Sequence, residues 1–237
     1  MSRKRTALIP FAMLAFAAVG AVSFPGLRTH RVQAATEQAV SVLINNTPEI
    51  PLEIAHPTAV SLPAGLKGLT YTLVNRGDQR LLAVEVTWEL HFENGVTRPA
   101  VDRADYAFSA DIAPGASDNM EMGSYVLITH PSPVKSVTGE ITFAQFADGT
   151  ALGSDRAGVL PWLRAGRSAT LDEYHRLLEI YRSGGESALA RALVAQSDAD
   201  TFRGRADRRE LQKLQLRSGI NAVEGKLNQV ASMKLPE

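Results

Sequence analysis

The chain has 237 residues, and its 25 Lys and Arg residues are balanced by 25 Asp and Glu residues, so its formal net charge is zero. A neutral chain lacks the basic surface that nucleic-acid phosphates require, which argues against a nucleic-acid partner. The sequence contains no cysteine. This excludes disulfide bonds and lipid attachment at a cysteine, so the fold depends on its apolar core.

The N-terminus has the pattern of a membrane-targeting segment. Arg3, Lys4 and Arg5 precede an uncharged, largely apolar run from Thr6 to Phe24. A basic start before an apolar run is typical of a secretory signal, and this run approaches the ~20 residues that a membrane-spanning helix needs. We therefore expect residues 1–34 to be a signal peptide or an uncleaved N-terminal membrane anchor.

Two imperfect cleavage sites leave both outcomes open. The tripeptide Ala21-Val22-Ser23 is followed at once by Phe24-Pro25, and Val32-Gln33-Ala34 lies ten residues beyond the apolar run. In either case the basic residues at the start hold the N-terminus inside the cell. The rest of the chain is then expected outside the cytoplasm, either periplasmic or extracellular, or held at the membrane by the N-terminal helix.

Residues 38–157 show a period of two. The clearest example is the segment 84–92, where Val84, Val86, Trp88, Leu90 and Phe92 alternate with Glu85, Thr87, Glu89 and His91. Such alternation predicts a strand with one face in a core and the other in water. Turn signals such as Asn94-Gly95 separate it from further predicted strands, at 39–44, 69–74, 106–112, 120–126 and 137–143. About seven short strands without a helical period predict an antiparallel β-sandwich.

Three segments carry a resemblance to a known class of domain: LTYTLVNRGDQRLLAVEVTWEL (69–90), DIAPGAS (111–117) and ITFAQFADGT (141–150). Their order resembles the immunoglobulin-like or fibronectin-type-III-like modules of bacterial exported proteins, in which a strand ending near Asn leads through a Gly-containing turn to a core strand. The resemblance implies a sandwich with Trp88 in its core, and it supplies no functional residues.

From residue 158 to residue 237 the pattern becomes helical. Thr170 and Glu173 have the spacing of a capping box at a helix start. The apolar residues that follow it recur on one helical face: Leu171, Tyr174, Leu178 and Tyr181. We expect Gly184-Gly185 to end this helix and a second, Ala-rich helix to cover residues 186–196.

A third helix is predicted from Arg205 towards Met233. Its apolar residues form a narrow seam: Leu216, Ile220, Val223, Leu227 and Val230. The seam is too short for a coiled coil, which needs three to four heptads. We therefore expect it to pack on neighbouring helices, with partner binding or dimerisation as the alternative.

We predict no catalytic, metal or cofactor site. His91 shares a predicted strand face with Glu85 and Glu89, and His175 lies one helical turn from Glu179. Surface positions explain both groups more simply than metal binding does. No Gly-x-Ser-x-Gly elbow or phosphate-binding loop is present.

One charged cluster stands out in the helical region. Four arginines are interleaved with four acidic residues: Arg203, Arg205, Arg208 and Arg209 with Asp198, Asp200, Asp207 and Glu210. Local ion pairs at a helix start account for this cluster, and a site for anionic lipid or an acidic partner is the alternative.

These patterns favour an exported, envelope-associated, non-enzymatic binding or structural module with a protein partner in the envelope. The alternatives are an extracytoplasmic enzyme and an accessory domain of a larger envelope complex. An enzyme would need a site assembled from scattered residues such as Asp102, Asp105, Glu121 and His130.

Overall fold

A computed structural model describes residues 37–63, 65–108, 112–122, 128–129, 131–154, 156–195 and 202–235. The N-terminal targeting segment and its two candidate cleavage sites lie outside the described residues. Within the described part of the chain, none of the helices combines the length and the apolar character needed to cross a membrane.

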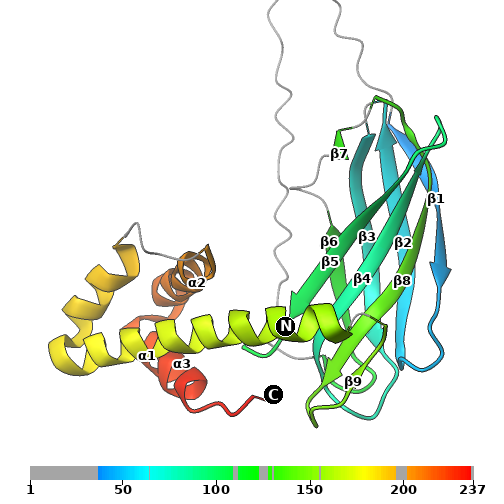
Figure 1. Cartoon of the computed structure of the whole chain (residues 1–237). Coiled ribbons are helices and arrows are strands. Elements are labelled where there is room, and N and C mark those ends of the chain that lie inside the picture. Colours follow the sequence, from blue (N-terminus) through cyan, green and yellow to red (C-terminus); the bar gives the residue numbers. More distant parts are fainter. Residues whose placement is uncertain are drawn as a thin grey trace, which may run out of the picture. The chain divides into compact units, whose positions relative to one another are not determined.

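The described residues form nine strands followed by three helices (Figure 1). The strands are β1 (Gln38–Asn45), β2 (Leu52–Leu62), β3 (Gly65–Asn75), β4 (Leu81–Phe92), β5 (Thr97–Asp105), β6 (Ser117–Met122), β7 (Ile128–Thr129), β8 (Val134–Phe146) and β9 (Ala151–Leu152). The helices are α1 (Arg156–Val194), α2 (Phe202–Ser218) and α3 (Ile220–Ala231). The expectation of a mainly β chain with C-terminal helices is confirmed.

The strands form one mixed sheet in the order β5-β4-β8-β1-β2-β3-β6, curled so that its two halves share a core. β1 connects the halves, because residues 38–40 pair antiparallel with β2 and residues 41–45 pair parallel with β8. The predicted purely antiparallel arrangement of about seven strands is therefore wrong. Alternation reveals which face of a strand is buried, but it does not reveal the neighbouring strand or its direction.

The core is organised around Trp88 of β4, which is fully buried. Its ring packs on Tyr71 of β3 at a centroid distance of 5.1 Å, and Gly139 of β8 lies beside it in the sheet. A Cβ atom at Gly139 would lie 2.2 Å from the indole ring, so the glycine makes room for the tryptophan. The expected core position of Trp88 is confirmed.

The two edge strands, β5 and β6, lie at the open ends of the curled sheet, and side chains link the β5 end to β3 and to β6. The Tyr71 hydroxyl donates to Asp102 of β5 at 2.8 Å, and the Tyr106 hydroxyl contacts the sulfur of Met120 in β6 at 3.2 Å. Burial, together with the neighbouring Asp102 and Asp118 carboxylates, raises the pKa of both tyrosines above the usual range. Both phenols therefore stay protonated, and they form these links without backbone pairing.

The strand predicted at residues 106–112 is wrong, and β2 and β5 were not predicted. β5 ends at Asp105, and residues 107–108 form a turn. Its core-facing residues Ala100, Asp102 and Ala104 are small or polar, so β5 lacks the large apolar alternation that marks a strand in a sequence. The inward carboxylate of Asp102 is accommodated because Tyr71 donates a hydrogen bond to it.

α1 begins 14 residues before the predicted capping box, so that prediction is wrong. Thr170 lies inside α1, and its hydroxyl donates to Asp207 of α2 at 2.9 Å. The predicted break at Gly184-Gly185 is confirmed as a kink, because Gly185 has φ 66° and ψ −164°. α1 therefore consists of two helical stretches with a change of direction at that glycine.

The predicted third helix is divided at Gly219, whose φ is 80°. Val223, Leu227 and Val230 of α3 are fully buried against α1 and α2, and Ile220 packs beside them. Leu216, at the end of α2, is 87% exposed. The seam therefore packs on neighbouring helices as expected, except at Leu216.

Candidate binding surface

The first turns of α1 cover part of the outer face of the sheet. Val159 and Leu163 of α1 are buried against Ala83 of β4 and Phe143 of β8, and these four residues form a small apolar cluster separate from the main core. The first half of β4 is consequently buried on both faces, whereas its second half alternates between buried and more exposed residues.

A buried hydrogen-bonded network joins α1 to the sheet. Arg167 of α1 is 5% exposed, and its guanidinium pairs with the Asp105 carboxylate at 3.0 Å. Another of its N–H groups donates to the Gln145 side chain at 2.7 Å. A buried charge requires such a partner, because an unpaired one costs several kcal/mol. Asp105, considered above as part of a dispersed enzyme site, therefore has a structural partner.

A second polar contact lies beside this network. Glu85 of β4 is 1% exposed, accepts a hydrogen bond from Thr142 at 2.9 Å and forms an ion pair with Arg103 of β5. The Arg103 guanidinium lies 5.4 Å from the ring centre of Trp162 on α1, within cation–π range. The prediction that Glu85 faces water is wrong, because α1 covers this end of the strand.

β5 has a free edge beyond this covered region. In the described sheet it pairs only with β4. The bonds from Tyr106 N–H to Leu82 O and from Phe92 N–H to Val96 O show that even-numbered residues of β5 face β4 through their backbone groups. In an antiparallel pair the alternate residues point the other way. The backbone groups of residues 97, 99, 101, 103 and 105 are therefore directed away from β4.

We call Val101, Arg103 and Trp162 the β5 edge surface. Val101 is 48% exposed and Trp162 is 40% exposed. Val101 shares the outer face of the sheet with Arg103, because the two residues are two apart in β5. The surface thus combines two exposed apolar side chains with a backbone edge that can pair with another strand. Pro99, which lacks an N–H, limits this edge to its C-terminal half.

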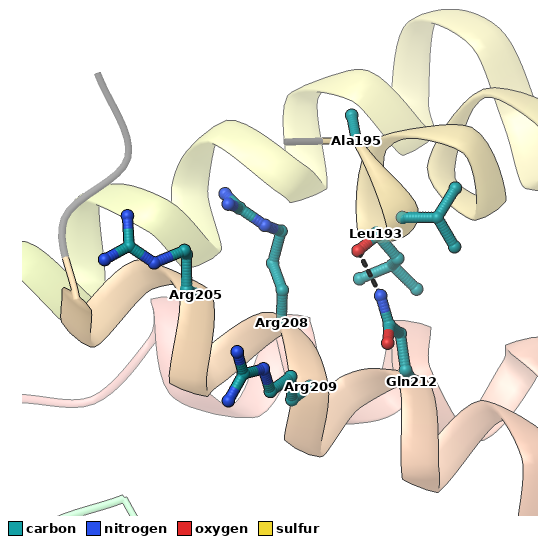
Figure 2. A pocket seen from close by; sticks show the side chains of 7 residues that line it. Leu193, Ala195, Arg205, Arg208, Arg209 and Gln212 are labelled. Atoms are coloured by element: carbon teal, nitrogen blue, oxygen red, sulfur yellow. Dashed lines mark hydrogen bonds between the residues drawn. The ribbon is translucent and has the colours of Figure 1, made fainter. Parts of the chain in front are cut away.

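A pocket lies between α1 and α2 (Figure 2). Arg205, Arg208 and Arg209 line a pocket of about 100 Å³ together with the last residues of α1, and Gln212 donates to the carbonyl of Leu193. Carbonyl groups at the end of a helix carry partial negative charge and attract cations. The arginines therefore lie where they can complement the partial charge at the end of α1.

In the arginine cluster, Arg208 is held by a contact between helices. Arg208 is 5% exposed and pairs with Glu173 of α1 at 2.8 Å. Arg176 of α1 pairs with the same carboxylate at 2.7 Å. Although desolvation acts in the opposite direction, these two arginines hold the pKa of Glu173 below its usual value. Asp198, Asp200 and the Arg203 side chain lie outside the described part of the cluster.

The histidine groups from the sequence have ordinary polar contacts. His91 lies 3.1 Å from the Thr97 hydroxyl and 3.2 Å from that of Thr138. His175 contacts the carbonyl of Ala231 in α3 at 3.1 Å. No group of three or more metal-ligand side chains gathers among the described residues. His130 lies outside the described residues.

Asp102 and Asp105 belong to different contacts, although both lie on β5. Asp102 faces the core and accepts from Tyr71, whereas Asp105 pairs with Arg167 on the outer face. Glu121 lies on the opposite edge strand, β6. The three described residues of the dispersed enzyme site are thus divided between two faces and two edges of the sheet.

Comparison with known proteins adds little to this geometry. No family model and no curated protein matches the chain. Among solved structures, an X-ray structure of the Northeast Structural Genomics Consortium target SoR45 is similar over 49% of this chain and 78% of its own length, with 13% sequence identity and a TM-score of 0.28. A likeness at this level carries no functional argument.

Proposed function

We propose that this protein is an exported, envelope-associated and non-enzymatic binding module that pairs an extended segment of a protein partner along the free edge of β5. The targeting pattern at the N-terminus supports export, by cleavage or with the segment retained as an anchor. The observation that carries the binding proposal is the β5 edge surface. Its backbone edge at Val101 is directed away from β4, and Val101 and Trp162 are both exposed beside it.

Strand addition is a common way for a sheet to bind a peptide, because backbone hydrogen bonds supply affinity and side chains supply specificity. Folded proteins usually protect such edges with charge, proline or a covering element. Here Pro99 interrupts the first half of β5, whereas Val101 offers an N–H and an apolar side chain in the second half. This position suits a partner strand of only a few residues.

The β domain also supports a family-level proposal. We propose that it is a variant of the immunoglobulin-like or fibronectin-type-III-like sandwich. Support comes from β1, which divides its pairing between the two halves of the sheet, and from a single aromatic-centred core between those halves. The variant would differ from a purely antiparallel sandwich in its parallel β1–β8 pair.

The test uses a backbone substitution. Val101→Pro removes the outward N–H without removing a bond to β4, so the domain should remain folded. Val101→Ala retains the N–H and is the matched control. With a photo-crosslinking phenylalanine derivative in place of Trp162, within the same surface, the full-length protein in its native envelope should form a discrete adduct.

We expect Val101→Pro to abolish the adduct and Val101→Ala to preserve at least part of it. A crosslinker placed at Glu179 on exposed α1 surface measures background. The proposal fails if position 162 forms no discrete adduct above that background. It also fails if the folded Val101→Pro protein forms the adduct as well as the wild type.

A further inference from the structure

Another pocket lies away from the β5 edge surface and from the pocket between α1 and α2, where the β3–β4 and β8–β9 connections meet. It has a volume of about 140 Å³ and is lined by residues from the start of β2, from both connections and from the strand ends: Pro51, Gly77, Asp78, Gln79, Phe146, Asp148, Thr150 and Leu152. An engineered cavity of about 150 Å³ accommodates a benzene molecule. This pocket therefore has room for the end of one long side chain.

Hydrogen bonds hold the β3–β4 wall of the pocket in place. Asn75 is fully buried, and its side-chain amide donates to the carbonyls of Gln79 at 2.7 Å and Ile112 at 2.9 Å. Its side-chain oxygen accepts from the N–H of Gly77 at 3.0 Å. The Arg76 N–H donates to the Pro51 carbonyl at 2.9 Å. This wall is therefore formed before any ligand arrives.

The β8–β9 wall is also an ordered turn. The Phe146 N–H donates to the carbonyl of Thr150 at 2.9 Å, and the Gly149 N–H donates back to Phe146 at 3.0 Å. The Asp148 carboxylate accepts from the Thr150 N–H at 2.9 Å. Gly149 has φ 89°, a conformation that glycine adopts without strain. Because both walls are ordered, binding here requires little loss of conformational freedom.

The floor and the rim of the pocket differ in chemistry. Phe146, which is 3% exposed, Leu152 and Pro51 form an apolar floor. Asp78 and Asp148 lie at the rim and are exposed, and within the described residues neither forms an ion pair. The nearby Arg76 is already paired with Glu53 at 2.8 Å. The pocket therefore offers apolar contact at its base and two exposed carboxylates, those of Asp78 and Asp148, at its mouth.

We propose that this pocket receives the side chain of a lysine or arginine from a protein partner. Such a side chain has an aliphatic stem that packs on apolar surface and a cationic head that stays near water and carboxylates. The stem would contact Phe146 and Leu152, and the head would remain between Asp78 and Asp148. This inference goes beyond the proposed β5 contact and depends on different residues.

The experiment compares two small probes of similar shape. Nα-acetyl-lysine N-methylamide carries the cation, and Nα-acetyl-norleucine N-methylamide carries an uncharged aliphatic chain. Each is titrated into the ¹⁵N-labelled full-length protein in non-ionic detergent, and the amide signals of Gly77 and Gly149 are followed by NMR. We expect saturable shifts, with the lysine probe binding about fivefold more tightly.

Two double variants test the carboxylates. Asp78→Asn with Asp148→Asn should remove the preference for the lysine probe, because the amide oxygen at position 148 can still accept from Thr150 while both charges are lost. Asp172→Asn with Glu179→Gln makes the same chemical change on α1 and should leave the preference intact.

The inference is overturned if neither probe gives a saturable shift, if norleucine binds as tightly as lysine, or if the Asp78/Asp148 variant retains the wild-type preference. None of these outcomes affects the Val101→Pro test, so this pocket and the β5 edge surface can fail independently.

Discussion

The outer face of β4 contains two regions that look alike in sequence and differ in structure. Near the start of the strand, Ala83 and Glu85 are both 1% exposed because α1 packs over them. Near its end, Glu89 is exposed and His91 is half-buried. In both regions the outer-face residues alternate along β4 with residues that face the core. The difference shows that a polar residue on the alternate face of a strand is solvated only where no other element covers it.

The covered region also requires specific polar chemistry that the open region does not. Glu85 needs Arg103 and Thr142, and Asp105 needs Arg167 and Gln145, because water cannot reach them freely. In the open region, His91 and Glu89 retain access to water. Substitutions across this face should therefore fall into a graded series.

The largest effect is expected for Arg167→Ala. Removing the guanidinium leaves the Asp105 carboxylate buried without its cationic partner, which should lower the free energy of unfolding by about 3–5 kcal/mol. Urea unfolding monitored by tryptophan fluorescence measures the change. A loss below about 1 kcal/mol would show that water replaces the arginine, and it would contradict a tight contact between α1 and the sheet.

A smaller effect is expected for Glu85→Ala, which should lower the free energy of unfolding by about 2 kcal/mol. Hydrogen bonds to charged groups contribute roughly 1.5–3 kcal/mol to stability, and Arg103 remains partly solvated when its partner is lost. Glu85→Gln is the matched variant, since it can retain the bond from Thr142 while losing the charge. Urea midpoints for the two proteins separate the contribution of charge from that of the hydrogen bond. Equal stability of Glu85→Ala and the wild type would mean that Glu85 is solvated after all.

Trp162→Ala should lower the free energy of unfolding by about 1 kcal/mol. Its cation–π contact with Arg103 is partly exposed, and such contacts contribute about 0.5–1 kcal/mol. Thermal unfolding followed by circular dichroism measures this loss. Trp162→Phe should recover part of it because the aromatic face is retained. If the two variants were equally destabilised, the contact with Arg103 would not depend on the ring.

The smallest effect is expected for His91→Ala. It should change the free energy of unfolding by no more than about 0.5 kcal/mol, as most surface substitutions do. The same urea measurement applies, and Thr138→Ala provides a neighbouring comparison. Adding Zn²⁺ should leave the unfolding midpoint of the wild type unchanged. A metal-dependent increase that disappears in His91→Ala would show that the open region of β4 holds a metal.

Much of the local structure could be predicted from the sequence. Alternation located β4 and the buried position of Trp88, and Asn94-Gly95 marked the β4–β5 turn, where Gly95 has φ 83°. The spacing of Val223, Leu227 and Val230 indicated their common buried face. In each case the signal is local, because buried residues recur every second residue along a strand and about every 3.6 residues along a helix.

The candidate surfaces could not be predicted in the same way. β5 went unnoticed because its inward residues are small or polar, and the charge of Asp102 concealed its contact with Tyr71. The pocket beside Asp78 and Asp148 joins two loops that lie far apart in the chain, and no local pattern links them.

By itself, the sequence determined the elements whose signal is local: an N-terminal targeting pattern, a β-rich region followed by helices, and a chain that relies on its apolar core without disulfide bonds. Only the tertiary structure decided that β1 pairs in parallel with β8, that α1 buries Glu85, and that β5 pairs with β4 alone in the described sheet. Each of these depends on which distant segment lies alongside a strand. A strand carries the same alternation whatever covers its outer face, so that information arises only when the chain has folded.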